Sequence, residues 1–198
     1  MDAHTSQTTT RPVLPHPYVP ARQAASVIML RQAGSGLEAF VQHRATTMDF
    51  AAGAVVFPGG RTDPEDADFD FGGPIRPVLA QHSIGWQKTS LGATHPEQAQ
   101  RNASMMLRTG LREVEEETGV DLLPQVMRPW ANLITPVGYP KRFDTFFYLA
   151  VVNDDIMPQN ITTEATFADW HRIADVLHDA DAQRIALMSP TRYLLEGI

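Results

Sequence analysis

The chain has 198 residues, of which 43% are hydrophobic and none is cysteine, and its formal net charge is −7 at pH 7. This length and apolar content suffice for one domain with a buried core. The lack of cysteine excludes disulfides, thiolate metal sites and cysteine nucleophiles. The acidity argues against a nucleic-acid surface, which would need a basic patch.

Residues 1–22 are predicted to form a disordered tail, because they combine Thr, Pro and His without an apolar run. They lack the apolar segment of a signal peptide, and no stretch of the chain approaches membrane-spanning length. We therefore expect a cytoplasmic protein with no membrane partner, in which residues 23–198 form a single domain.

Apolar segments after the tail predict the first strands. Ala25–Arg31 and Ala39–His43 flank a Gly-Ser-Gly turn and are expected to be two strands. The segment Ala54–Phe57 is a third, and the Pro-Gly-Gly that follows it predicts a tight loop. Asp63–Pro77 is acidic and rich in Gly and Pro, so we expect it to be a loop.

A long helix is predicted to begin at a capping box, Thr94-x-x-Glu97, with Pro96 in its first turn. Gly119 is expected to end it. Apolar residues three and four apart would form its buried face: Ala99, Ala103, Met106, Leu107, Leu111 and Val114.

The end of this helix carries an unusual acidic cluster. Glu113, Glu116 and Glu117 are spaced i, i+3, i+4, which places them on one face at the negative end of the helix dipole. Like-charge pairs at this spacing cost about 0.2–0.5 kcal/mol each. A divalent cation would remove this penalty, and an oxygen-ligated ion such as Mg²⁺ or Mn²⁺ suits it best. The alternative is a solvated acidic face, which is what most Glu-rich runs are.

Further strands are expected at Trp130–Pro136, Phe143–Val152 and Phe167–His171, followed by a short helix at Ile173–His178. A last helix is predicted to start with Ser189 as N-cap and Pro at the first helical position. It reaches the end of the chain almost at once, which leaves open a longer natural protein. The seven histidines are scattered without ligand spacing, so we interpret them as structural or surface residues.

The segment Arg112–Val120, R-E-V-E-E-E-T-G-V, resembles the second half of the Nudix box, G-x5-E-x7-R-E-U-x-E-E-x-G-U, where U is aliphatic. This motif occurs in hydrolases that act on nucleoside diphosphates linked to another moiety. The first half is expected upstream at Gly59-Gly60. Counting on from Gly60 puts the acidic slot at Asp66, with Glu65 as the competing candidate. The box is therefore interpreted as interrupted by an insertion at about residues 67–93.

An interrupted box with Phe-Pro-Gly-Gly before the insertion resembles one branch of the family, which includes the peroxisomal coenzyme A diphosphatases. A second stretch supports this branch. Ile134-Thr135-Pro136 and Pro140–Phe147 are similar to its segment I-T-P…P-R-R-F-D-T-x-F-F, with Lys141 in place of an Arg.

The resemblance implies an α/β protein, a Nudix-type α/β/α sandwich with a mixed β-sheet, and a hydrolase that uses Mg²⁺ or Mn²⁺. It implies that Glu116 and Glu117 are the main metal ligands and that the carbonyl of Gly60 contributes to the site. Glu113 would be a further ligand or would assist in activating water.

Arg112 would orient these acids. The resemblance thus implies that Arg112 and the three glutamates are the catalytic residues. The resemblance also implies a set of residues that contact the substrate: Gly59, Gly60, Lys141 and Arg142.

The implied substrate is a small-molecule nucleoside diphosphate derivative, and the branch favours coenzyme A or an acyl-CoA. Within the enzyme class, ADP-ribose, NADH and dinucleoside polyphosphates are the alternatives. Outside it, a Nudix-like domain could bind such a ligand without cleaving it, as a sensor. The intact R-E-x-x-E-E weighs against a sensor, and Asp66 in place of Glu weighs mildly for it. The sequence is also compatible with a homodimer.

Overall fold

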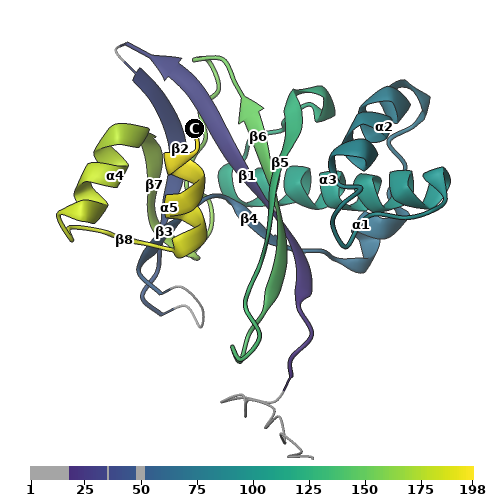
Figure 1. The fold of residues 1–198 in the computed structure, drawn as a ribbon. Helices are drawn as coiled ribbons and strands as arrows, with labels where there is room; N and C mark the ends of the chain where they lie inside the picture. The colour runs from purple at the N-terminus through teal and green to yellow at the C-terminus, as the bar shows by residue number, and fades with distance from the viewer. Residues whose placement is uncertain (1–17, 35, 48–51) are drawn as a thin grey trace, which may run out of the picture.

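The computed structural model describes residues 18–34, 36–47 and 52–198, and Figure 1 shows their arrangement. Within this described part, eight strands form one mixed sheet. They are β1 (Arg22–Ala33), β2 (Gly36–Arg44), β3 (Ala54–Val56), β4 (Gly59–Arg61), β5 (Met127–Ile134), β6 (Phe143–Val151), β7 (Ala165–Arg172) and β8 (Ala186–Leu187).

Helices cover both sides of this sheet (Figure 1). One group contains α1 (Pro64–Asp68), the 3₁₀ turn η1 (Gly73–Ile75), α2 (Arg76–Gly85) and the long α3 (Pro96–Thr118). A second 3₁₀ turn, η2 (Pro124–Val126), leads into β5. The opposite group contains α4 (Ile173–Asp181) and α5 (Ser189–Glu196).

The strand order is β5-β6-β1-β2-β3-β8, with β4 paired to β1 and β7 paired to β2. The β1–β6 and β3–β8 pairs are parallel, and the other pairs are antiparallel. The N-terminal part of β1 pairs with β4, whereas its C-terminal end pairs with β2. β1 therefore joins the two halves of the sheet.

β1 is apolar along most of its length because both of its faces are buried. Val27 and Met29 belong to the core cluster on the α3 side, with Met106, Leu107 and Tyr148. Ile28 and Leu30, which alternate with them along the strand, pack on the other side of the sheet, where α4 and α5 lie. They belong to the core cluster that contains Val41, Val176, Leu194 and Leu195. This alternation produces two hydrophobic layers, one on each face of the sheet, and confirms the predicted α/β/α sandwich with a mixed sheet.

Two segments that were predicted to be loops contain regular secondary structure. The Gly59-Gly60 segment continues into the short strand β4, which is hydrogen-bonded to β1. The segment Asp63–Pro77 contains α1, η1 and the start of α2. Its content of proline does not prevent helix formation, because Pro64 and Pro77 lie in first turns, where proline is well tolerated.

The starts of two helices also differ from expectation. α3 has His95 as its N-cap with no side-chain cap, so the Thr94 capping box does not form. This shift puts Pro96 at the first helical position, which its fixed φ favours. α5 begins at Ser189 itself, with Met188 as N-cap. The end of α3 was predicted correctly, because Gly119 adopts a left-handed conformation with φ 73° and its N–H bonds to Glu115 O at 2.8 Å.

The predicted tail falls mostly on residues 1–17, which lie outside the described residues. The division into a tail, one domain and an insertion at about 67–93 stays a prediction, although that segment includes η1 and all of α2. In the described part of the chain, no helix is both long and apolar enough to cross a membrane.

Candidate active site

α3 places its three glutamates at graded depths. Leu111 and Val114 are buried against the core, and the glutamates occupy the adjoining face of the helix. Glu117 is only 6% exposed. The side chains of Glu113 and Glu116 are 14% and 56% exposed, so the acidic face extends from the interior to solvent. Glu115 is exposed and points away from this face, as the helical register predicts.

The turn between β3 and β4 is fixed against β1. Val27 N–H and Ser26 Oγ both donate to Pro58 O, at 2.9 and 3.0 Å. Gly59 N–H then donates to Glu117 Oε2 at 3.1 Å. A Cβ at Gly60 would overlap the carboxyl group of Glu113. Gly60 therefore permits the close approach of β4 to α3, and Gly59, where a Cβ would overlap Ala25 and Ser26, permits that of β4 to β1. The two halves of the interrupted box lie together.

Asp66 occupies the acidic slot. Arg112 donates to both of its carboxylate oxygens, from Nε to Oδ1 at 3.0 Å and from Nη2 to Oδ2 at 2.9 Å. Asp66 is 1% exposed, whereas its neighbour Glu65 is exposed. Oδ2 also accepts from Thr109 Oγ1 and from Asp63 N–H, each at 2.9 Å. The structure thus favours Asp66 over Glu65 and connects α1 to α3.

These contacts determine the charge of Asp66. Burial alone would raise its pKa, but hydrogen bonds from Arg112, the Asp63 backbone and Thr109 outweigh burial, and the pKa lies below its usual value. The same bond to Asp66 raises the pKa of Arg112. The contact with Arg112 therefore favours the ionised form of Asp66.

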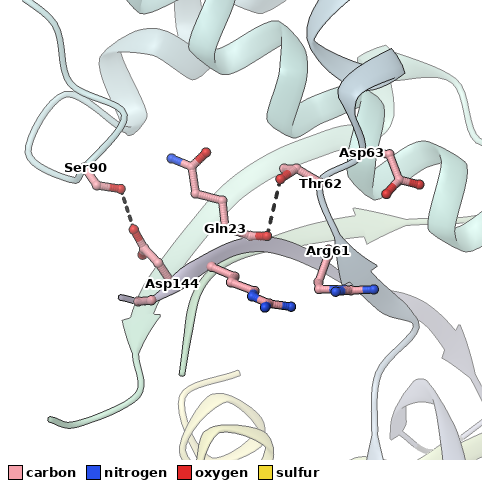
Figure 2. Close-up of a pocket in the computed structure, with 8 residues that line it drawn as sticks. Gln23, Arg61, Thr62, Asp63, Ser90 and Asp144 are labelled. Carbon is pink, nitrogen blue, oxygen red and sulfur yellow. Dashed lines mark hydrogen bonds between the residues drawn. The ribbon is translucent and has the colours of Figure 1, made fainter. Parts of the chain in front are cut away.

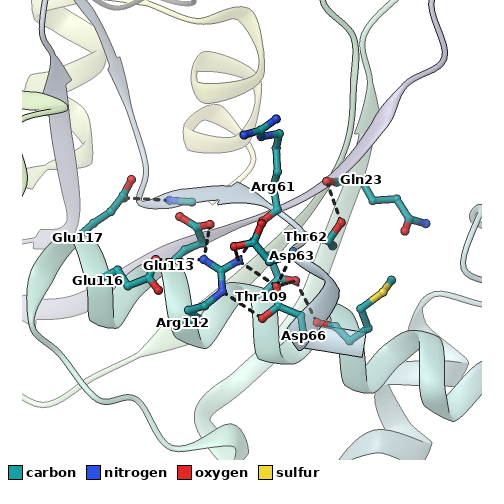
Figure 3. Close-up of polar contacts among 12 residues, drawn as sticks. Gln23, Arg61, Thr62, Asp63, Asp66, Thr109, Arg112, Glu113, Glu116 and Glu117 are labelled. Carbon is teal, nitrogen blue, oxygen red and sulfur yellow. Dashed lines mark hydrogen bonds and ion pairs between the residues drawn. The ribbon is translucent and has the colours of Figure 1, made fainter. Parts of the chain in front are cut away.

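Arg112 also connects Asp66 to the glutamates, as Figure 3 shows. Its Nη1 donates to Glu113 Oε1 at 2.8 Å and to Glu116 Oε2 at 3.0 Å. Its Nη2 additionally reaches Arg61 O at 3.0 Å. One guanidinium thus hydrogen-bonds to three carboxylates and the backbone of β4, and a fourth carboxylate, that of Asp63, lies 3.8 Å away. The orienting role of Arg112 toward metal ligands stays a prediction.

Among the described residues, Glu117 forms no ion pair with a basic side chain. Burial, and to a smaller extent the nearby Glu113, raise its pKa to about 7 against the lowering effect of the Gly59 N–H. Burial likewise raises the pKa of Glu113, although Arg112 opposes this shift. The buried amide of Gln42 also approaches Glu117, but its Nε2 meets no acceptor in full hydrogen-bond geometry within the described residues.

The carboxylates fit a divalent cation by their chemistry. They supply hard oxygen donors on one helix face. The innermost, Glu117, is buried without a positive partner among the described residues, so its ionised form is costly unless a cation binds. As the side chains stand, the described residues contain no closed group of three acidic or histidine side chains that could hold a metal. Glu113 and Glu116 are instead engaged by Arg112.

An open cleft of about 590 Å³ adjoins the box (Figure 2). It is lined by residues 21–23, residues 61–63, Ser90 and Asp144, and it touches the acidic network through Asp63 rather than through the glutamates. Ser90 Oγ donates to Asp144 Oδ2 at 2.5 Å, and Asn132 Nδ2 donates to Oδ1 at 2.6 Å. This buried carboxylate therefore ties the segment before α3 to the sheet.

The two basic residues predicted to contact substrate differ in environment. Lys141 is exposed. Arg142 is buried, and its guanidinium donates to the carbonyls of Thr135 and Pro136 at 3.0 and 3.1 Å and to Val19 O at 2.6 Å. Arg142 thus fastens the loop before β6 to the start of β1. Contact of either residue with substrate stays a prediction.

Several residues of the site were missed by sequence reasoning. Asp63 and Thr109 complete the shell around Asp66, and Gln42 reaches Glu117 from β2. The capping relationship of Asp63 and Asp66, three residues apart with a proline between them, was the one available signal. Thr109 and Gln42 lie in apolar segments and carried no signal.

Comparison with known proteins gives a consistent result. No family model matches the chain. A Caenorhabditis elegans protein provisionally named nudix hydrolase 7 is 28% identical over 183 residues, covering 88% of this chain. The chain spans 59% of the length of that relative.

Three solved structures illustrate the fold. A NUDIX hydrolase from Alicyclobacillus acidocaldarius has a TM-score of 0.68 at 22% identity and covers 89% of this chain and 90% of its own. An Ap4A hydrolase from C. elegans, solved as a binary complex, has a TM-score of 0.54 at 14% identity, with coverages of 89% and 93%. The NUDIX domain of Shewanella oneidensis NrtR, solved with ADP ribose, has a TM-score of 0.55 at 15% identity, with coverages of 90% and 86%.

These similarities show the Nudix fold, and together with the name of the relative they support a Nudix hydrolase. They do not single out the coenzyme A branch.

Proposed function

We propose that this protein, which has the Nudix fold, is a divalent-metal-dependent hydrolase that cleaves the diphosphate linkage of a nucleoside diphosphate derivative. The observation that carries this proposal is the meeting of the α3 glutamates with the Gly59-Gly60 backbone, where Gly59 N–H bonds Glu117 and the Glu113 carboxyl lies against Gly60. An acidic helix face that only meets solvent would not need contacts with a distant segment or a buried carboxylate, whose ionised form is costly.

In this proposal the metal ligands are Glu113, Glu116, Glu117 and the carbonyl of Gly60. A bound Mg²⁺ or Mn²⁺ would neutralise the non-bridging phosphate oxygens and polarise the water that attacks phosphorus. Glu113 is close enough to Gly60 to act at the same position, either as a ligand or as the group that helps to activate this water.

The residues around the glutamates position them. Arg112 holds Glu113 and Glu116 by ion pairs at 2.8 and 3.0 Å. Asp66 in turn fixes the plane of the Arg112 guanidinium through two parallel bonds. Asp66 is therefore proposed as a support for the orienting arginine instead of a primary ligand, because both of its oxygens are already engaged.

The substrate is proposed to lie beside Gly59 and Gly60, because this turn adjoins the glutamates proposed to hold the metal. Lys141 is proposed to meet phosphate directly. Arg142, whose guanidinium bonds to three backbone carbonyls, is proposed to contribute mainly by holding the loop that carries Lys141.

Coenzyme A or an acyl-CoA is the proposed substrate, which rests on the similarity of the interrupted box and of the segment from Ile134 to Phe147 to the coenzyme A diphosphatases. Cleavage would give adenosine 3′,5′-bisphosphate and a phosphopantetheine. The neighbouring structures favour a second candidate class, because one is an Ap4A hydrolase and another holds ADP ribose. A homodimer and a cytoplasmic location stay predictions.

The test is a mass-spectrometric screen of nucleoside diphosphate derivatives with Mg²⁺ or Mn²⁺. The panel contains coenzyme A, an acyl-CoA, ADP-ribose, NADH and a dinucleoside tetraphosphate. We expect cleavage of at least one compound at a phosphoanhydride linkage, with coenzyme A or its acyl derivative preferred. Tight binding of a compound without any cleavage would instead favour the sensor.

A further inference from the structure

Two arginines lie side by side on one face of the β1–β4 pair. Arg61 is directly opposite Ala24 in the antiparallel register, and Arg22 precedes Ala24 by two positions on β1. Residues directly opposite share a face, as do residues two apart on a strand. Arg22 and Arg61 are therefore diagonal neighbours, whose separation in such pairs is roughly 7–8 Å.

Both side chains are solvent-exposed and lack an acidic partner. Within residues 18–34, 36–47 and 52–198, neither forms an ion pair with a carboxylate. Most other arginines of the described chain do pair with acids, and Arg142 is engaged by backbone carbonyls. In a protein of net charge −7, two adjacent unpaired guanidinium groups are a local exception.

These arginines line the cleft beside the candidate active site. The cleft of about 590 Å³ includes residues 22 and 61 in its lining. Arg61 follows Gly60 directly, and its carbonyl accepts from Arg112, so its backbone belongs to the acidic network. Figure 3 shows that its side chain leaves β4 on the side away from Arg112. Arg61 thus joins the diphosphate end of the site to the cleft.

We propose that Arg22 and Arg61 form a binding site for a phosphate group that the substrate carries in addition to the two phosphates of the cleaved anhydride. Guanidinium groups bind phosphate by paired charge-assisted hydrogen bonds, and two of them can share one dianion. This phosphate site rests on the proposed function, because we assume that the α3 glutamates and their metal hold the diphosphate of the substrate. The cleft then receives the part of the ligand that lies next to it.

Two kinds of ligand carry such a phosphate close to the anhydride. One is a phosphate monoester on the ribose, which only the sugar separates from the diphosphate. The other is a longer polyphosphate chain. ADP-ribose has neither, so the two arginines would discriminate among the candidate substrates.

Binding of uncleaved ligands tests this site by calorimetry in Mg²⁺. Adenosine 3′,5′-bisphosphate compared with adenosine 5′-monophosphate tests the ribose monoester. An analogue of ATP with methylene groups at both bridging positions, compared with the α,β-methylene analogue of ADP, tests the longer chain. The variants are Arg22→Gln, Arg61→Gln and the double substitution, and Arg76→Gln is the control because Arg76 is exposed on α2 outside the cleft.

We expect wild-type protein to bind one of the two additional-phosphate ligands about tenfold more tightly than the matched compound that lacks this phosphate, which is the effect of roughly one charge-assisted contact. Each single variant should reduce this ratio, the double variant should bring it close to one, and Arg76→Gln should leave it unchanged. Thermal unfolding should shift little in any variant, because the exchanged side chains are exposed and unpaired.

A ratio near one in the wild type, or an unchanged ratio in the double variant, would overturn the proposal. The outcome is separable from that of the substrate screen. Arginine-dependent preference without any cleavage would refute the hydrolase and retain the phosphate site. Cleavage without arginine-dependent preference would refute only the phosphate site.

Discussion

Arg112 and Asp66 are joined by two parallel hydrogen bonds of 3.0 and 2.9 Å across 46 residues of chain. The pair brings α1 against α3, and the remaining nitrogen of the guanidinium holds Glu113 and Glu116. Because Asp66 is buried and Arg112 connects it to the acidic face, this single contact determines both local stability and the orientation of the proposed metal ligands.

Replacing Asp66 should therefore affect stability and activity together. In Asp66→Asn the carboxylate charge is lost while its size is kept, and Arg112 loses its strongest partner. We expect the free energy of unfolding without metal to fall by about 2 kcal/mol, as for hydrogen bonds to charged groups, and turnover to fall by about tenfold through misplaced glutamates. Urea unfolding in EDTA and a steady-state assay measure the two effects. Glu65→Gln, at the exposed neighbour, is the control and should change neither.

Glu117 and Glu115 provide a test of the helical face. Glu117→Gln keeps the acceptor for Gly59 N–H but removes the charge proposed to hold the cation, so turnover should fall by at least about a hundredfold. Metal-free stability should stay level or rise, because a buried charge without a cation is removed. Glu115→Gln should be nearly silent in both measurements. Equal damage from the two substitutions would show that the acidic face is assigned incorrectly.

Cation binding should depend on pH through Glu117. In the metal-free protein its pKa is raised to about 7, so below pH 7 the carboxyl is protonated and a cation must displace that proton. Mn²⁺ affinity measured by electron paramagnetic resonance should thus weaken by up to about tenfold for each pH unit below 7. Calorimetry in buffers of different ionisation enthalpy should detect proton release near pH 6.5. In Glu117→Gln this component of the pH dependence should be lost.

His82 should make the fold sensitive to acid. It is buried, its Nε2 bonds Met127 O at 3.1 Å, and burial lowers its pKa to about 4. The unfolded chain, with a pKa near 6.5, takes up the proton first as the pH falls. His82 therefore contributes full stability above about pH 6.5, and this contribution decreases toward pH 4 by about 3 kcal/mol.

Urea unfolding at several pH values in EDTA measures this effect. His82→Gln retains a donor for Met127 O but does not titrate, so its stability should fall less steeply between pH 6.5 and 4. The difference between the two proteins isolates His82 from the acidic residues. Parallel profiles would contradict the assignment.

The parts of the site that follow from local pattern were predictable. The periodicity of α3 placed the glutamates correctly on the face beside Leu111 and Val114, and Gly119 marked its end. The spacing from Gly60 correctly favoured Asp66 over Glu65, because that spacing reflects how far the chain travels from β4 to α1. In the same way, the apolar run at Ala25–Arg31 predicted a strand, which the structure extends to Arg22–Ala33.

Other features depend on contacts between distant segments. The expected loop after β4 is partly helical because Asp63 caps α1 and Arg112 binds Asp66, a tertiary contact that outweighs the local effect of Gly and Pro. The bond between Ser90 and Asp144 spans 54 residues, and no spacing rule links the two. Arg142 resembled a phosphate contact in the sequence, yet its burial against three carbonyls emerges only in the fold.

The dependence of turnover on a divalent cation tests the central claim most directly. Purified protein is treated with EDTA, transferred to metal-free buffer and assayed with the best compound of the screen while Mg²⁺ or Mn²⁺ is added back. We predict no measurable cleavage in excess EDTA, recovery that saturates with added cation, and no recovery in Glu117→Gln at the same cation concentration. Equal turnover in excess EDTA, or full recovery in Glu117→Gln, would contradict the account.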